Sequence, residues 1–178
     1  PLLPRERDEQ GRAAREALTN HVVTIDAPFY TPMDADSVPT GEIATVEGTP
    51  MDFRKPTAIG LRIDDNFEQL QFGRGYDHNY VLAKNFPGEY AFAAEAYSPQ
   101  TGIVMTVYTT EPGVQLYTGN WLNGFTGKCN RTYSARTAVC FETQHFPDSP
   151  NKPHFPSTLL RPGETYTQTC RYQFSVRQ

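Results

Sequence analysis

The chain has 178 residues, a formal charge of −4, 20% charged residues and 38% hydrophobic residues. That length suits one domain with a sizeable core, and the mild acidity argues against nucleic-acid binding, which needs a basic patch or stripe. No apolar run approaches the roughly 18 residues of a membrane-spanning helix, so we expect no nucleic-acid partner and no membrane partner.

Turn-forming residues are frequent, with Pro present 15 times and Gly 13 times, and aromatic residues make up 12% of the chain. Short segments separated by many turns favour β over α architecture. The cysteines are Cys129, Cys140 and Cys170, an odd number without C-x-x-C spacing, so we expect reduced thiols rather than a disulfide framework. Because the N-terminus also carries no apolar signal core, we expect a cytoplasmic protein.

The first 21 residues differ from the rest of the chain. Helix formers dominate between Pro4 and Leu18, although Gly11 weakens a helix there by about 1 kcal/mol relative to Ala. We expect residues 1–21 to form an N-terminal arm, either a short surface helix or a frayed segment. Residues 22–178 then form one β domain.

After the arm, the apolar residues recur with a period of two, which is typical of strands. Residues 22–27 alternate apolar and polar side chains, and Leu61 and Ile63 alternate with Arg62 and Asp64. Both patterns predict strands.

Two runs rich in strand formers, 90–97 and 103–110, flank a turn that contains Pro and Gly, which predicts a hairpin. The last run, 165–176, alternates most clearly, with Tyr172 and Phe174 on its apolar face. The sequence therefore predicts an all-β chain of many short strands. A sandwich, a jelly roll and a large twisted sheet all stay open.

A carboxylate and an amide share one face of the predicted strand 139–146. They are Glu142 and Gln144, which point to the same side because side chains alternate along a strand. A charged Glu is costly to bury in a core, whereas beside a cleft it can accept a proton. The alternative is a Glu on a solvated sheet face.

Two further segments carry polar side chains. Gly73 and Gly75 predict a tight turn that delivers Asp77 to the start of a strand; alternatively, Asp77 bonds its own backbone in an Asx turn. Gln115 and Tyr117 share the polar and aromatic face of a later strand. Such a face suits a sugar, because hydroxyls need polar partners and C–H faces stack on rings. Ordinary cross-strand packing is the alternative.

The histidines give weaker signals. His21 stands where the arm meets the first strand, and a lone His is usually structural or merely exposed. His145 and His154 have no familiar metal spacing with Cys or carboxylates. The run Asp34–Asp36 lacks the Gly and terminal Glu of a calcium loop. We predict no metal site.

A series of motifs resembles, in the same order, those of the aldose 1-epimerases, or galactose mutarotases. The motifs are Pro39–Ile43, Val46–Phe53, Gly75–Asn79, Tyr108–Gln115, Tyr117–Asn120, Glu142–Asp148 and Phe155–Thr158. The resemblance implies an all-β, galactose mutarotase-like β-supersandwich. It also implies an enzyme that interconverts the α and β anomers of free hexoses by acid–base ring opening and closure, without a cofactor.

The resemblance also implies roles for single residues. Glu142 matches the family's base, and His21 matches the histidine that protonates the ring oxygen. Asp77 and Gln115 look like the residues that hold sugar hydroxyls.

The resemblance covers only the C-terminal half of the enzyme. Half a sandwich would expose apolar sheet faces and unpaired edges, so we expect a partner, either an N-terminal fragment or a second copy in a homodimer. Two other functions stay open: a sugar-binding protein without turnover, and a structural fragment that needs its partner to fold.

Overall fold

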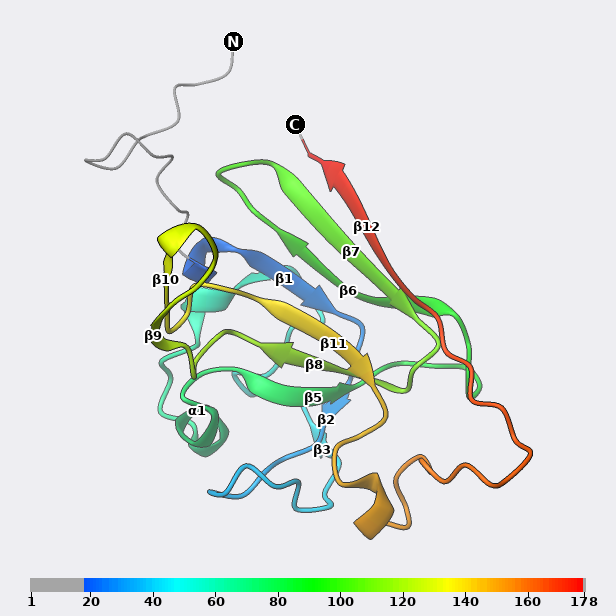
Figure 1. Ribbon diagram of the computed structural model, residues 1–178. Helices are drawn as coiled ribbons and strands as arrows, with labels where there is room; N and C mark the ends of the chain where they lie inside the picture. The colour runs from blue at the N-terminus through cyan, green and yellow to red at the C-terminus, as the bar shows by residue number, and fades with distance from the viewer. Residues whose placement is uncertain (1–17, 178) are drawn as a thin grey trace.

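The computed structural model describes residues 18–177 and contains two five-stranded sheets, packed into a β-sandwich (Figure 1). All strand neighbours within the two sheets are antiparallel. The first sheet has the order β12-β7-β6-β1-β4, and the second has the order β11-β8-β5-β2-β3. The prediction of an all-β fold is therefore confirmed.

The elements have the following bounds. The first sheet consists of β1 (Val22–Ile25), β4 (Thr57–Ala58), β6 (Ala91–Tyr97), β7 (Ile103–Thr109) and β12 (Cys170–Val176). The second sheet consists of β2 (Phe29–Tyr30), β3 (Ala44–Thr45), β5 (Asp77–Val81), β8 (Gly113–Tyr117) and β11 (Cys140–Gln144). Outside them lie α1 (Glu68–Gly73), a hairpin of β9 (Asn123–Thr126) and β10 (Thr132–Ser134), and 3₁₀ turns at Leu18–Asn20, Ile59–Leu61, Lys128–Asn130 and Ser149–Asn151.

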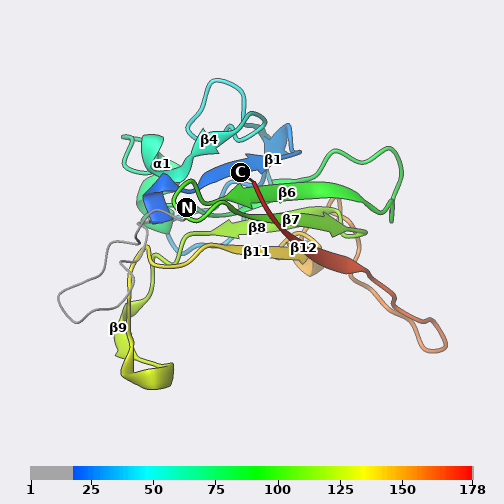
Figure 2. The same ribbon diagram turned by 90° about the horizontal axis from the view of Figure 1, so that it is seen from above.

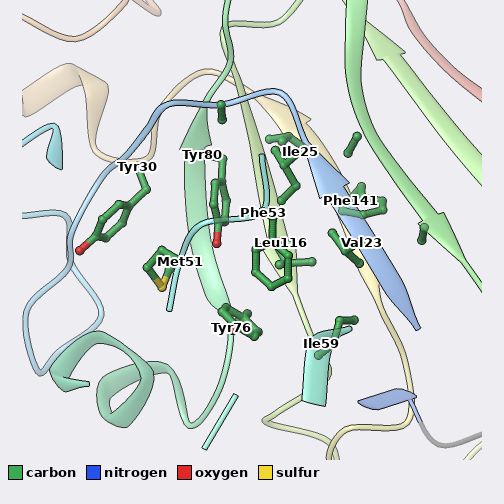
Figure 3. Close-up of a cluster of buried hydrophobic side chains, with 14 of the residues drawn as sticks. Val23, Ile25, Tyr30, Met51, Phe53, Ile59, Tyr76, Tyr80, Leu116 and Phe141 are labelled. Atoms are coloured by element: carbon green, nitrogen blue, oxygen red, sulfur yellow. The ribbon is translucent and has the colours of Figure 1, made fainter. Parts of the chain in front are cut away.

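Both sheets turn alternate apolar side chains into one core, which Figure 3 shows. Val23 and Ile25 enter it from the first sheet, and Leu116 and Phe141 from the second; each is at most 3% exposed. This alternation is what a strand with one buried face requires.

The segment 46–53 crosses the core and fixes the start of β5. The ring of Phe53 meets that of Tyr76 edge to face at 4.9 Å and that of Tyr80 at 6.4 Å. All three rings are at most 1% exposed. Edge-to-face pairs of this kind stabilise a particular geometry as well as burying area, so the backbone at Asp77, which follows Tyr76, is held in place.

The hairpin predicted for 90–97 and 103–110 is confirmed as β6 and β7, and the first predicted strand contains β1. The strand expected around Leu61 and Ile63 is wrong. Ile59–Leu61 forms a 3₁₀ turn instead, and Leu61 is 70% exposed. The turn packs against the turn Leu18–Asn20 so closely that a Cβ on Gly60 would lie 2.6 Å from Thr19 Cβ. That close approach, rather than strand pairing, dictates the local backbone.

The last strand begins at Cys170 rather than at 165 and pairs along its whole length with β7. Tyr172 and Phe174 lie opposite Val107 and Met105, so the predicted apolar face does point toward the core side of the sheet. Nevertheless Phe174 is 67% exposed, because β12 is the edge of its sheet and diverges from β11 (Figure 1). A hydrogen bond joins the two edges: the Tyr172 hydroxyl donates to the Phe141 carbonyl at 2.7 Å.

Most of the predicted arm, residues 1–17, lies outside the described residues. Within residues 18–177, no helix has the length and apolar character needed to cross a membrane. Figure 2 shows the β9–β10 hairpin projecting from one end of the sandwich.

The fully buried Leu116 provides a test of the core. Leu116→Ala should lower the free energy of unfolding by about 2–5 kcal/mol, because it deletes buried methyl groups and leaves a cavity. Leu61→Ala, at a side chain that is 70% exposed, is the control and should change it by less than about 0.5 kcal/mol. Urea unfolding of both variants measures this, and equal losses would contradict the core described above.

Candidate active site on the second sheet

Three neighbouring strands of the second sheet, β5, β8 and β11, present polar side chains on the face away from the core. Glu142 pairs with Gln115, and Gln115 pairs in turn with Asn79 on its other side. Tyr117 pairs with Asp77. Partners in an antiparallel sheet point to the same side, so these side chains share one surface while Leu116 and Phe141 point into the core.

The side chains of this polar face form a hydrogen-bonded chain. Gln115 Nε2 donates to Asp77 Oδ1 at 2.9 Å, and its Oε1 accepts from Gln144 Nε2 at 3.0 Å. Gln144 Nε2 also lies 3.3 Å from Asn79 Oδ1. Gly113 makes room for this arrangement, because a Cβ there would lie 2.4 Å from Asn79 Oδ1. The amides are thus oriented before any ligand binds, as a binding site requires.

Asp77 is held from two sides. Besides Gln115, it accepts a hydrogen bond from Trp121 Nε1 at Oδ2, at 3.1 Å. Its side chain therefore joins neighbouring strands and loops, and the alternative of an Asx turn closed on its own backbone is wrong. The next residue, His78, points to the other side and is 2% exposed. Burial lowers the pKa of His78 to about 3, so this imidazole is neutral at physiological pH.

Glu142 differs from Asp77 in its surroundings. Within residues 18–177 its carboxylate makes no hydrogen bond, and the residue is exposed on the sheet face. Partial burial, and then the negative charge of Asp77, raise the pKa of Glu142 above its ordinary value. A carboxylate whose pKa is raised is a stronger base and gives its proton back less readily to water. The carboxylate of Asp77 is already hydrogen-bonded, whereas that of Glu142 has no such bond within the described residues. Glu142 is therefore the carboxylate suited to proton transfer.

Comparison with known proteins identifies the family. A family model described as aldose 1-epimerase matches residues 11–173. The chain belongs to the aldose 1-epimerase family. It is 44% identical to the human galactose mutarotase over 160 residues, which is 89% of this chain and 45% of the human protein. It is 34% identical to the aldose 1-epimerase of Escherichia coli K12 over 157 residues, 87% of this chain and 45% of that protein.

The fold agrees with solved structures of this family. The crystal structure of the GalM/aldose epimerase homologue from C. elegans superimposes with a TM-score of 0.79 at 28% identity, over 91% of this chain and 47% of that one. The galactose 1-epimerase from Lactobacillus acidophilus gives a TM-score of 0.70 at 27% identity, over 92% and 46%. The chain thus spans about half the length of the relatives that it matches.

The structure brings together three of the four site residues expected from the sequence: Glu142, Asp77 and Gln115. The fourth, His21, stands outside the strands that carry them. His21 lies just before β1 in the first sheet, where its carbonyl accepts from Ile59 N at 2.9 Å. Its Nδ1 is buried. The role of His21 stays a prediction.

A second polar cluster, built around one buried carboxylate, was not predicted from the sequence. Glu111, 3% exposed, accepts hydrogen bonds from Tyr166 OH and pairs with His145 Nδ1, both at 2.6 Å. It ties the turn between β7 and β8 to the end of β11 and to the strand-free segment before β12. These three residues line a cleft of about 1050 Å³, which Glu142, Gln115 and Asp77 do not line. Glu111 and His145 also fall within motifs of the resemblance, but the resemblance assigns them no part in the reaction.

No group of three metal-ligating side chains occurs among residues 18–177. A place for Trp121 beside Asp77 was not predicted either. Trp121 lies in a turn beyond β8, where no strand alternation indicates which way a side chain points.

The electrostatic link between the two carboxylates can be measured. Asp77→Asn removes a negative charge, so the pKa of Glu142 should fall toward its ordinary value; the contribution of burial, which is the larger cause, should remain. An NMR titration of the glutamate carboxyl carbons measures this. Asp36→Asn, on an exposed turn, is the matched control and should leave that pKa unchanged. An unchanged pKa in Asp77→Asn would show that the two groups do not interact.

Proposed function

We propose that the protein containing this chain is an aldose 1-epimerase that interconverts the α and β anomers of free hexoses. The observation that carries the proposal is Glu142, a carboxylate with a raised pKa, set beside the hydrogen-bonded pair Asp77 and Gln115 on an open sheet face. Relatives named galactose mutarotase and aldose 1-epimerase support it.

The chemistry follows from this geometry. The carboxylate of Asp77 accepts hydrogen bonds from sugar hydroxyls, and the amide of Gln115 donates hydrogen bonds to them or accepts from them. These bonds place the anomeric hydroxyl near Glu142. Glu142 removes the proton of that hydroxyl while an acid protonates the ring oxygen, so that the bond between the anomeric carbon and the ring oxygen breaks and an aldehyde forms. The aldehyde carbon rotates, the ring oxygen attacks its other face, and both protons return. Atoms and charges balance without a cofactor.

The proposal also needs an acid at the ring oxygen. By resemblance it is His21, which in the structure stands directly before β1, with its carbonyl accepting a hydrogen bond from Ile59 N. A second candidate function is a protein that binds hexoses without turning them over, because His21 stands outside the strands that carry Glu142, Asp77 and Gln115. Calorimetry and polarimetry with galactose separate the two: binding without faster mutarotation would support the second function and overturn the first.

Glu142→Gln tests the base directly. The amide cannot accept the proton, so mutarotation measured by polarimetry in the full-length protein should slow by about a hundredfold to ten-thousandfold, while galactose should still bind. Glu164→Gln, on an exposed segment far along the chain, is the control and should keep full activity. A fully active Glu142→Gln variant would overturn the assignment of the base.

We also propose a partner for the apolar face of β12. Phe174 and Val176 are 67% and 70% exposed, and Ile103, opposite Val176 on β7, is 49% exposed. Contiguous exposed apolar surface of this kind marks an interaction site. Because the relatives are about twice as long as the match, the proposed occupant is a segment equivalent to their unmatched half, and a second copy of this chain is the competing one.

A charge placed on this face tests the proposal. Phe174→Asp in the full-length protein should lower the free energy of unfolding by several kcal/mol, because a covered carboxylate would be desolvated without a partner. Leu61→Asp, at a side chain that is also 70% exposed, is the matched control and should cost little. Equal effects in thermal and urea unfolding would mean that the face stays open. A concentration-dependent effect would point to a second copy.

A further inference from the structure

Trp121 stands beside the polar face, in the turn after β8, and is the only tryptophan in the chain. Its indole Nε1 donates to Asp77 Oδ2 at 3.1 Å, while Gln115 occupies Oδ1. The two donors approach the carboxylate from a loop and from a neighbouring strand. Together they leave Asp77 little freedom to rotate.

Trp121 is itself held firmly. Its backbone N–H donates to the Tyr117 hydroxyl at 3.1 Å, and the Arg74 guanidinium lies 4.4 Å from the centroid of its ring. A cation over an aromatic face is attracted by the ring electrons, so Arg74 holds the indole from one side.

The turn that carries Trp121 is anchored by the residue before it. Asn120, 6% exposed, donates from Nδ2 to the carbonyls of Gly73 and Tyr76, both at 2.8 Å. Gly75, with φ of +134°, allows this approach, because a Cβ there would lie 2.6 Å from Asn120 Oδ1. The turn after β8 and the turn before β5 therefore form one unit, which sets Trp121 against Asp77.

We propose that Trp121 is a positioning residue of the sugar site, acting through Asp77 by holding its carboxylate toward the hydroxyls of a bound pyranose. This inference rests on the proposed function. Packing does not account for the residue, because 46% of its surface is exposed. What it supplies is a fixed N–H donor to a charged acceptor, which is among the stronger hydrogen bonds in proteins.

The role predicts a change in substrate affinity rather than in the proton transfer. Trp121→Phe keeps an aromatic ring over which Arg74 can lie, and removes the N–H. In the full-length protein, the KM for galactose should rise about tenfold, as expected for the loss of a hydrogen bond to a charged group. The kcat should stay within about twofold, because Glu142 is untouched.

A double-mutant cycle shows whether Trp121 acts through Asp77. In an Asp77→Asn background, Trp121→Phe should raise KM no further, because the coupled partner is already gone. Phe125→Leu, at an aromatic ring on the separate β9–β10 hairpin that is 56% exposed, is the control and should leave KM unchanged. Thermal unfolding of each variant confirms that all are folded at the assay temperature.

The outcomes separate this inference from the proposed function. Wild-type protein that accelerates mutarotation, with an unchanged KM in Trp121→Phe, overturns the positioning role alone. The same holds if Trp121→Phe raises KM equally in both backgrounds, which would show a direct contact with the sugar, or if only kcat falls. Wild-type protein that neither binds galactose nor accelerates its mutarotation overturns the proposed function and this inference together.

Discussion

The antiparallel register of β5, β8 and β11 is the constraint on which the rest of the structure depends. Side chains alternate with a period of two, so a slip of one residue would exchange the two faces of a strand. Leu116 and Phe141 would leave the core, and Glu142 would enter it as a charge without a partner, at high cost. The same pairing that buries the core thus presents Glu142 and its polar neighbours on the other face, and the stability of the sheet maintains their arrangement.

Within that frame, the two carboxylates have different environments. Asp77 accepts two hydrogen bonds from fixed donors, whereas Glu142 accepts none within residues 18–177 and has a raised pKa. Neighbouring carboxylates with unequal surroundings can take unequal tasks, one holding a ligand and the other moving a proton. The separate roles proposed for Asp77 and Glu142 follow from this difference, because within the described residues only the oxygen atoms of Asp77, of the two, are hydrogen-bonded before a sugar binds.

The sequence predicted what is set by local alternation: the hairpin of β6 and β7, the polar face of β11, and the shared side of Gln115 and Tyr117. It could not predict what depends on contacts distant in sequence. The 3₁₀ turn at Leu61 follows from packing against Thr19, and the contact of Trp121 with Asp77 spans 44 residues. The exposure of Phe174 likewise depends on where the second sheet ends, which no local pattern encodes.

The hydrogen bond from the Tyr172 hydroxyl to the Phe141 carbonyl couples the two sheets at one edge of the sandwich. It connects the outermost strands of both sheets, and the residue after Phe141 is Glu142. A displacement of β12, such as one imposed by contact on its uncovered apolar side, would therefore be transmitted through this hydrogen bond to the backbone next to Glu142. In this fold the edge strand with the exposed apolar side and the strand that carries Glu142 are joined by a hydrogen bond.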